Sequence, residues 1–196
     1  MKRLMKKVLI LMLILAPVQV FGQQQYKLST SGSSVKIKGT STLHDWSMDA
    51  EGLSATMSAV TSDGLLQKVT AVNFSCPVEK IVSNESSMMD SKAHDAFKSE
   101  KNPTIKFNFT GQNSINAGND QVNGTITGNL SMAGETKSIK VSFSGKVLGS
   151  GHIVVTGTKS LKMSDYGMDP PTAMFGTISS GDEVTIVFTL EFMPAD

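Results

Sequence analysis

The sequence predicts an all-β fold of about eight antiparallel strands with one short α-helix between strands. Three observations predict it: apolar and polar residues alternate along much of the chain, short segments bearing Gly or Asn separate these runs, and one stretch has helical spacing. Alternation with a period of two is typical of strands that are buried on one face. Short connections with Gly or Asn are typical of hairpins, so the second half of the chain is predicted to be an antiparallel meander.

Each strand is predicted from its own alternating run. The clearest run is Val184 to Phe192, in which every second residue is apolar and most of the others are polar. The same period occurs from Ile105 to Phe109, from Val122 to Met132 and from Ile139 to Phe143. Further strands are predicted at Ser34–Ser41, Trp46–Met57, Leu65–Cys76 and His152–Met163.

Two segments depart from this alternation. Residues 87–98 carry apolar side chains at helical spacing, and Ser87 with Asp90 resembles a capping box, so we expect a short amphipathic helix. Asn102-Pro103 ends it and leads into the next strand. Residues 164–180 are rich in Gly and Pro and are predicted to form a long loop, a type of segment that often acts as a lid.

The glycines of one strand leave two interpretations open. Gly124 and Gly128 share a face with Ile126 and Leu130. Glycine within a strand marks a sharp bend or the close approach of another group, so this face indicates either barrel curvature or room for a chain-like ligand. About eight antiparallel strands can close into a barrel, but the pattern alone does not distinguish a barrel from a two-sheet sandwich.

Residues 1–22 have the features of a secretory signal peptide. Four basic residues precede an unbroken apolar run from Val8 to Leu15, and Gly22 supplies a small residue at the cleavage site. The run is far shorter than the roughly 20 residues that span a bilayer, which argues against a retained membrane anchor. We therefore expect export, no stable membrane insertion, and one domain over residues 23–196.

Charge and cysteine content restrict the function further. Of 18 Lys and Arg, four lie in the first 22 residues, and with 17 Asp and Glu the mature chain has a formal net charge of −3. This argues against nucleic acid as a partner. Cys76 is the only cysteine, so no intrachain disulfide forms and we expect a buried, unreactive thiol.

Three stretches resemble the YceI-like family in the same order along the chain. They are Gly39–Trp46, the segment from Met88 through His94-Asp95-Ala96-Phe97 to Phe107, and the hairpin Gly124–Lys137. The resemblance implies a lipocalin-like, eight-stranded antiparallel barrel in the bacterial periplasm, with an elongated apolar cavity for polyisoprenoids or similar amphiphiles. The family often has an Arg-x-Asp-Phe-Gly loop, whereas residues 162–167 here lack that Arg, so no headgroup contact carries over.

We expect the ligand-binding cavity to be lined by aromatic and aliphatic side chains on the inward faces of the strands and on the helix. A flexible lid is expected from the apolar residues of the long loop. The cavity candidates are Trp46, Met88, Phe97, Phe107, Phe109, Ile126, Leu130, Val141, Phe143, Ile186 and Phe188, and the lid candidates are Tyr166, Met168, Met174 and Phe175.

Catalytic and metal chemistry find little support in the sequence. His44, His94 and His152 lack metal-ligand spacing, and there is no nucleophile elbow, phosphate loop or dinucleotide fingerprint. We therefore expect no enzyme activity, metal or cofactor. The favoured function is a periplasmic carrier of a lipid such as an isoprenoid quinone or polyprenol. The alternative is a cell-envelope structural or interaction module with a packed core. Homodimerisation is left open.

Overall fold

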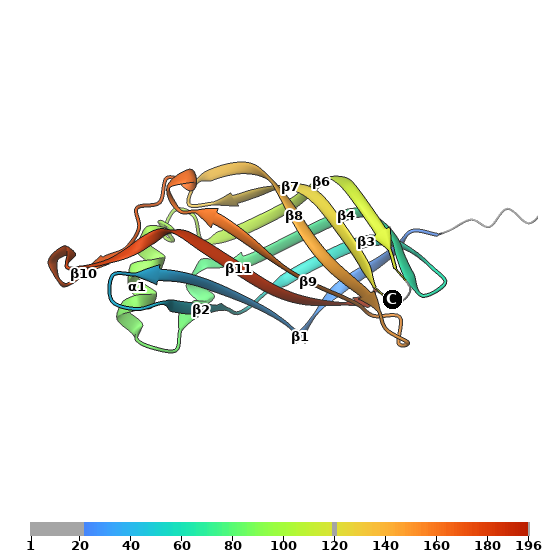
Figure 1. The fold of residues 1–196 in the computed structure, drawn as a ribbon, viewed down its shortest axis with the longest axis horizontal. Helices are drawn as coiled ribbons and strands as arrows, with labels where there is room; N and C mark the ends of the chain where they lie inside the picture. The colour runs from blue at the N-terminus through green and yellow to red at the C-terminus, as the bar shows by residue number, and fades with distance from the viewer. Residues whose placement is uncertain (1–21, 119–120, 196) are drawn as a thin grey trace, which may run out of the picture.

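The computed structural model describes residues 22–118 and 121–195, so nearly all of the predicted signal peptide lies outside the described residues. Most of the described chain is in strands, with one α-helix and three short 3₁₀ turns (Figure 1). The elements are β1 Gln24–Ser41, β2 Trp46–Ala50, β3 Ser54–Ser62, β4 Leu65–Pro77, η1 Val78–Lys80, β5 Ile81–Ser83, α1 Ser87–Ala96, β6 Thr104–Ala117, β7 Val122–Met132, β8 Glu135–Val147, β9 Ile153–Lys162, η2 Ser164–Tyr166, β10 Thr172–Ala173, η3 Met174–Gly176 and β11 Ile178–Pro194.

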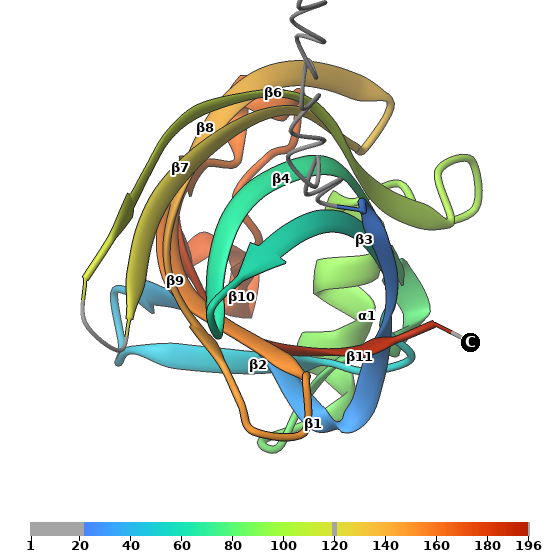
Figure 2. The same cartoon turned by 90° about the vertical axis from the view of Figure 1, so that its right-hand side faces the viewer.

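Eight of the strands close into a ring in the order β1-β3-β4-β6-β7-β8-β9-β11. The pairing of β1 with β11 completes the ring, and every pairing is antiparallel. Figure 2 shows the ring end-on, with α1 lying beyond it. The predicted eight-stranded antiparallel barrel with one helix between strands is confirmed, and a two-sheet sandwich is not what forms.

The predicted strand Trp46–Met57 is broken in two. Gly52, between β2 and β3, has a φ of +64°, in the left-handed region that interrupts a strand. As a result, β3 pairs with the first residues of β1, and β2 pairs with its second half. The expected long loop also contains a small hairpin, because β10 pairs with the start of β11.

Helix α1 begins at Ser87, and the residue before it, Ser86, is its N-cap. The Ser86 hydroxyl accepts a hydrogen bond from the Met89 amide at 3.3 Å, so the N-cap is Ser86 and the expected capping box at Ser87 is wrong. Asp90 accepts instead from the amide of Ser83 at 2.6 Å, which ties the helix to β5. Among the described strands, β5 pairs only with β2 and has no strand partner along its other edge. Helix α1 lies beside β5.

The barrel interior is packed tightly at the end away from α1. There the strand ends bring together fully buried side chains, among them Leu66, Val122 and Ile153, each at most 1% exposed. This filled end acts as a floor. The hydrophobic side chains nearer α1 form two further clusters, which surround rather than fill the interior.

Candidate ligand cavity

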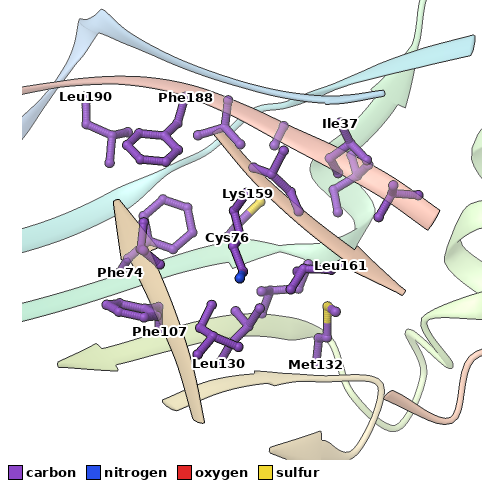
Figure 3. Close-up of a pocket in the computed structure, with 18 of the residues that line it drawn as sticks. Ile37, Phe74, Cys76, Phe107, Leu130, Met132, Lys159, Leu161, Phe188 and Leu190 are labelled. Atoms are coloured by element: carbon purple, nitrogen blue, oxygen red, sulfur yellow. The ribbon is translucent and has the colours of Figure 1, made fainter. Parts of the chain in front are cut away.

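A cavity of about 250 Å³ extends from the α1 end of the barrel down to the core cluster, whose Val69, Phe143 and Val155 line its far end. Its walls come from strands around the whole ring, and α1 contributes Ala93, Ala96 and Phe97. Figure 3 shows aromatic and aliphatic side chains from opposite walls pointing toward a common space. Nearly all of the lining is hydrocarbon or thioether, because successive inward positions on each strand carry apolar residues.

Nine of the eleven predicted cavity residues line this space. They are Trp46, Phe97, Phe107, Ile126, Leu130, Val141, Phe143, Ile186 and Phe188. Whether they contact a ligand stays a prediction, since the structure gives their position only.

Met88 and Phe109 do not line the cavity. Met88 is 67% exposed, because the inward face of α1 is formed by Met89, Ala93 and Phe97. Met88 lies about 100° around the helix from Met89. Phe109 packs against the core cluster at the filled end, and the β6 ladder is irregular immediately after it.

The predicted lid residues separate into two groups. Met168 lines the cavity, and the buried Tyr166 packs with it and with Met163. Met174 and Phe175 form the tip of the β10–β11 hairpin and are exposed, with Phe175 fully so. In this conformation they do not cover the cavity, because the hairpin projects from the end of the barrel (Figure 1).

Many lining residues were not among the sequence-based candidates, although the same alternation identifies most of them. The missed residues include Ile37, Met48, Phe74, Cys76, Ile105, Met132, Ile139, Leu161, Met163 and Leu190. Cys76 is buried as expected, and burial raises the pKa of its thiol to about 11, which keeps it protonated and weakly nucleophilic.

The inward glycines make room for aromatic rings. A Cβ at Gly124 would lie 2.5 Å from Cζ of Phe143, and one at Gly157 would lie 2.6 Å from Cζ of Phe188. Gly128 is covered in the same way by the ring of Phe107. These glycines therefore let cavity-lining phenylalanines lie flat against the wall, a reason that neither sequence interpretation included.

One wall of the hollow end is not closed by a strand ladder. β8 and β9 pair only from Ser144 opposite Thr156 to Val147 opposite Ile153, so most of β8 and the second half of β9 are unpaired with each other. The 163–171 segment lies near this split. Tyr166 packs with Ala133 of the β7–β8 turn, and the carbonyl of Gly167 accepts a hydrogen bond from Nζ of Lys98 at 2.8 Å.

Among the residues that the structure describes, Lys159 is the one charged residue that lines the cavity. Thr158 and Ser160 on either side of it are exposed, and Leu161, two residues on, also lines the cavity. The period of the strand therefore places Lys159 on the inward face. Figure 3 shows its side chain extending into the space, with the nitrogen surrounded by carbon. Lys159 was not among the residues predicted from the sequence.

The three histidines have local partners. Nε2 of His94 lies 2.9 Å from the carbonyl oxygen of Ile81, and Nδ1 of His152 lies 2.8 Å from Oε1 of Glu191. Nδ1 of His44 lies 2.7 Å from the carbonyl oxygen of Asp45. Over residues 22–118 and 121–195, no three His, Cys, Asp or Glu side chains are grouped as metal ligands would be. Nor does any helix there have the length and apolarity needed to cross a membrane.

Comparison with known proteins places this geometry in a recognised family. Residues 26–192 match the model of the YceI-like domain. Comparison with curated proteins gave no significant match.

Solved structures with the same fold share little sequence with the chain. Burkholderia cenocepacia BcnA is 18% identical, with a TM-score of 0.65, and the match covers 84% of this chain and 98% of that one. A polyisoprenoid-binding domain from Saccharophagus degradans, implicated in plant cell wall breakdown, is 14% identical over 87% of this chain and 98% of its own, with a TM-score of 0.64. A Campylobacter jejuni YceI protein is 18% identical over 76% and 84%, with a TM-score of 0.58. At these identities the structures establish a shared fold.

Proposed function

We propose that this chain, which belongs to the YceI-like domain family, is a binding protein that carries or sequesters a long apolar molecule inside its barrel. A polyisoprenoid, such as an isoprenoid quinone or a polyprenol, is the ligand class we favour. The name of the Saccharophagus degradans domain supports this choice, since that similar fold is described as polyisoprenoid-binding.

The observation that carries the proposal is the apolar cavity itself. Its walls are hydrocarbon and thioether, and packed side chains close its floor. Removing apolar surface from water gives roughly 25 cal/mol per Å², so a chain that buries several hundred Å² gains on the order of 10 kcal/mol before entropy costs. Shape and apolarity are thus sufficient to hold such a ligand.

The cavity also separates this proposal from the alternatives. A structural or interaction module would have a packed interior, whereas here a cavity extends into the barrel from the α1 end. A hydrolase would need an acid–base pair facing the substrate. Among the described lining residues, the titratable side chains are Lys159 and Cys76. None of the described lining residues carries a carboxylate or an imidazole. Binding without catalysis is therefore the function we infer.

We further propose that the protein acts in the periplasm after removal of residues 1–22. The basic residues, apolar run and small residue of that segment support export. An exported carrier would shield the apolar chain of its ligand from water. The mass of the mature protein isolated from the native host tests this part, because retention of residues 1–22 would contradict it.

Binding is tested by filling the cavity. Val141 lines it, while its neighbour Lys140 on β8 faces outward and is exposed. We expect delipidated wild-type protein and the control Lys140→Trp to bind geranylgeraniol, and Val141→Trp to lose at least roughly 10-fold in affinity through occlusion. Bound alcohol is quantified by mass spectrometry after separation of free ligand. Equal binding by both variants would contradict an interior site.

A further inference from the structure

Lys159 is held inside the barrel by the phase of its strand. Val155 and Leu161 on the same face line the cavity, and Thr158 and Ser160 on the other face are exposed. Turning Lys159 outward would need a shift of one residue, which would bring those polar side chains inward. The pairing of Lys159 with Ile186 on β11 fixes this register.

The ammonium group of Lys159 has no counter-charge in the cavity. The described lining includes no Asp or Glu, and within the described residues no ion pair or side-chain hydrogen bond involves Lys159. Lys159 is partly buried, and a charge that faces apolar side chains is better stabilised when it is paired, so this group is placed to bind an anion.

The surroundings of Lys159 leave space for such a partner. On the side toward β8, the backbone at Lys159 is not paired with another strand, because the β8–β9 ladder ends at Thr156. On its own strand the preceding inward residue is Gly157, over which the ring of Phe188 lies. Figure 3 shows the Lys159 nitrogen directed into the space that the labelled apolar side chains surround.

We propose that Lys159 binds the anionic head of a single-chain amphiphile, so that the acidic group lies inside the barrel with its apolar chain along the surrounding wall. The shared chemistry is a negatively charged oxygen that accepts hydrogen bonds, as in a carboxylate or a phosphate monoester. This inference rests on the proposed function and narrows its ligand class. It also supplies a polar contact in a chain whose 162–167 stretch lacks the loop arginine expected from the family resemblance.

The test compares acids with alcohols of the same chain. Oleic acid and oleyl alcohol form one pair, and geranylgeranyl phosphate and geranylgeraniol form the other. Delipidated wild-type protein is measured beside Lys159→Met, which keeps the unbranched apolar body of the side chain without its charged end. The matched control is Lys140→Met, an exposed lysine on β8. Affinities come from competition with a fluorescent fatty acid and from direct titration.

We expect wild type and Lys140→Met to bind at least one acid roughly 10-fold or more tightly than its alcohol, because hydrogen bonds to charged groups are the stronger ones. Lys159→Met should lose this preference while retaining the alcohols. The pair that shows the preference identifies the head as carboxylate or phosphate. The melting temperature of ligand-free Lys159→Met should not fall, since the substitution removes an unpaired charge.

Two results would overturn the inference. Equal affinity of wild type for acid and alcohol in both pairs would do so, without any need for a variant, and so would an undiminished preference in Lys159→Met. In either case alcohol binding would leave the proposed function intact. Failure of wild type to bind all four probes would overturn the proposed function itself, and this inference with it.

Discussion

At the end of the barrel where β4, β7 and β9 begin, side chains fill the interior, whereas at the end covered by α1 the interior is hollow. At the filled end β8 and β9 are joined by their ladder, and the core residues there are almost inaccessible to solvent. At the hollow end β8 and β9 have separated, and α1 lies beside β5 where the ladder stops. The same alternating strands run through both ends.

This difference separates stability from function within one barrel. A packed interior gains dispersion and hydrophobic energy from every inward side chain, and that gain offsets the cost of surfaces left unfilled elsewhere. The filled end can therefore stabilise the fold while the hollow end keeps room for a ligand. The predictions below test this division, from the largest expected effect to the smallest.

Truncating a leucine should cost much more at the filled end than at the hollow end. Leu66 is 0% exposed within the packed core, while Leu161 is partly buried and lines the cavity. We expect Leu66→Ala to lose about 2–5 kcal/mol of unfolding free energy, and Leu161→Ala less than about 2 kcal/mol. Urea denaturation of the ligand-free protein measures both. Equal losses would show that the two ends are packed alike.

The hydroxyl of Tyr166 is buried without a hydrogen-bond partner among the described residues. Burial, together with the nearby charge of Asp165, raises the pKa of this phenol. Tyr166→Phe removes the unpaired group, so we expect the unfolding free energy to stay equal or rise by about 1 kcal/mol. The control is Tyr26→Phe, because the Tyr26 hydroxyl donates to Oε1 of Gln24 at 3.2 Å. A clear loss in the Tyr166 variant alone, measured by urea denaturation, would contradict this.

Acid should loosen the hollow end before the filled end. Hydrogen bonds from the Ser164 hydroxyl and amide, at 2.6 and 2.8 Å, hold the pKa of Asp182 below its usual range. A carboxyl group whose pKa is lowered by folding stabilises the structure above its unfolded pKa, roughly 3.9, and this contribution is lost as the pH falls through its folded pKa. The protection of the 163–171 amides against hydrogen exchange, measured relative to the intrinsic rate at each pH, should therefore fall below about pH 4.

Asp182→Asn provides the matched check on this acid response. In that variant, the protection of the 163–171 amides should already be lower at neutral pH and should change little on acidification, while the core strands stay protected. An unchanged acid response in Asp182→Asn would assign the loosening to another group.

The exposed hairpin tip should contribute least to stability. Phe175 is fully exposed, so Phe175→Ser should change the unfolding free energy by no more than about 0.5 kcal/mol. Thermal denaturation of the ligand-free protein measures this effect. A larger loss would mean that the tip folds back over the cavity in solution, as the lid interpretation expected.

The alternation of apolar and polar residues determines which parts of the fold and the cavity could be predicted from the sequence. The period of two located inward faces such as 184–192, and seven of the nine predicted residues that line the cavity came from that signal, all except Trp46 and Phe97. It did not identify Lys159, because Thr158, Lys159 and Ser160 together resemble a solvent-exposed stretch. Only counting every second residue onward from the inward-facing Val155 places Lys159 on the inward face. The end of the β8–β9 ladder was also not predictable, since it depends on how distant segments pack. Met88 was misassigned because adjacent helix positions lie about 100° apart.

The most direct test of the central claim is native mass spectrometry of the mature protein, purified from its own host without detergent. We predict a population heavier than the polypeptide by the mass of one lipid, which organic extraction converts to the bare chain and which Val141→Trp lacks. A single species at the bare polypeptide mass, which takes up no isoprenoid or acidic lipid on incubation, would contradict the account.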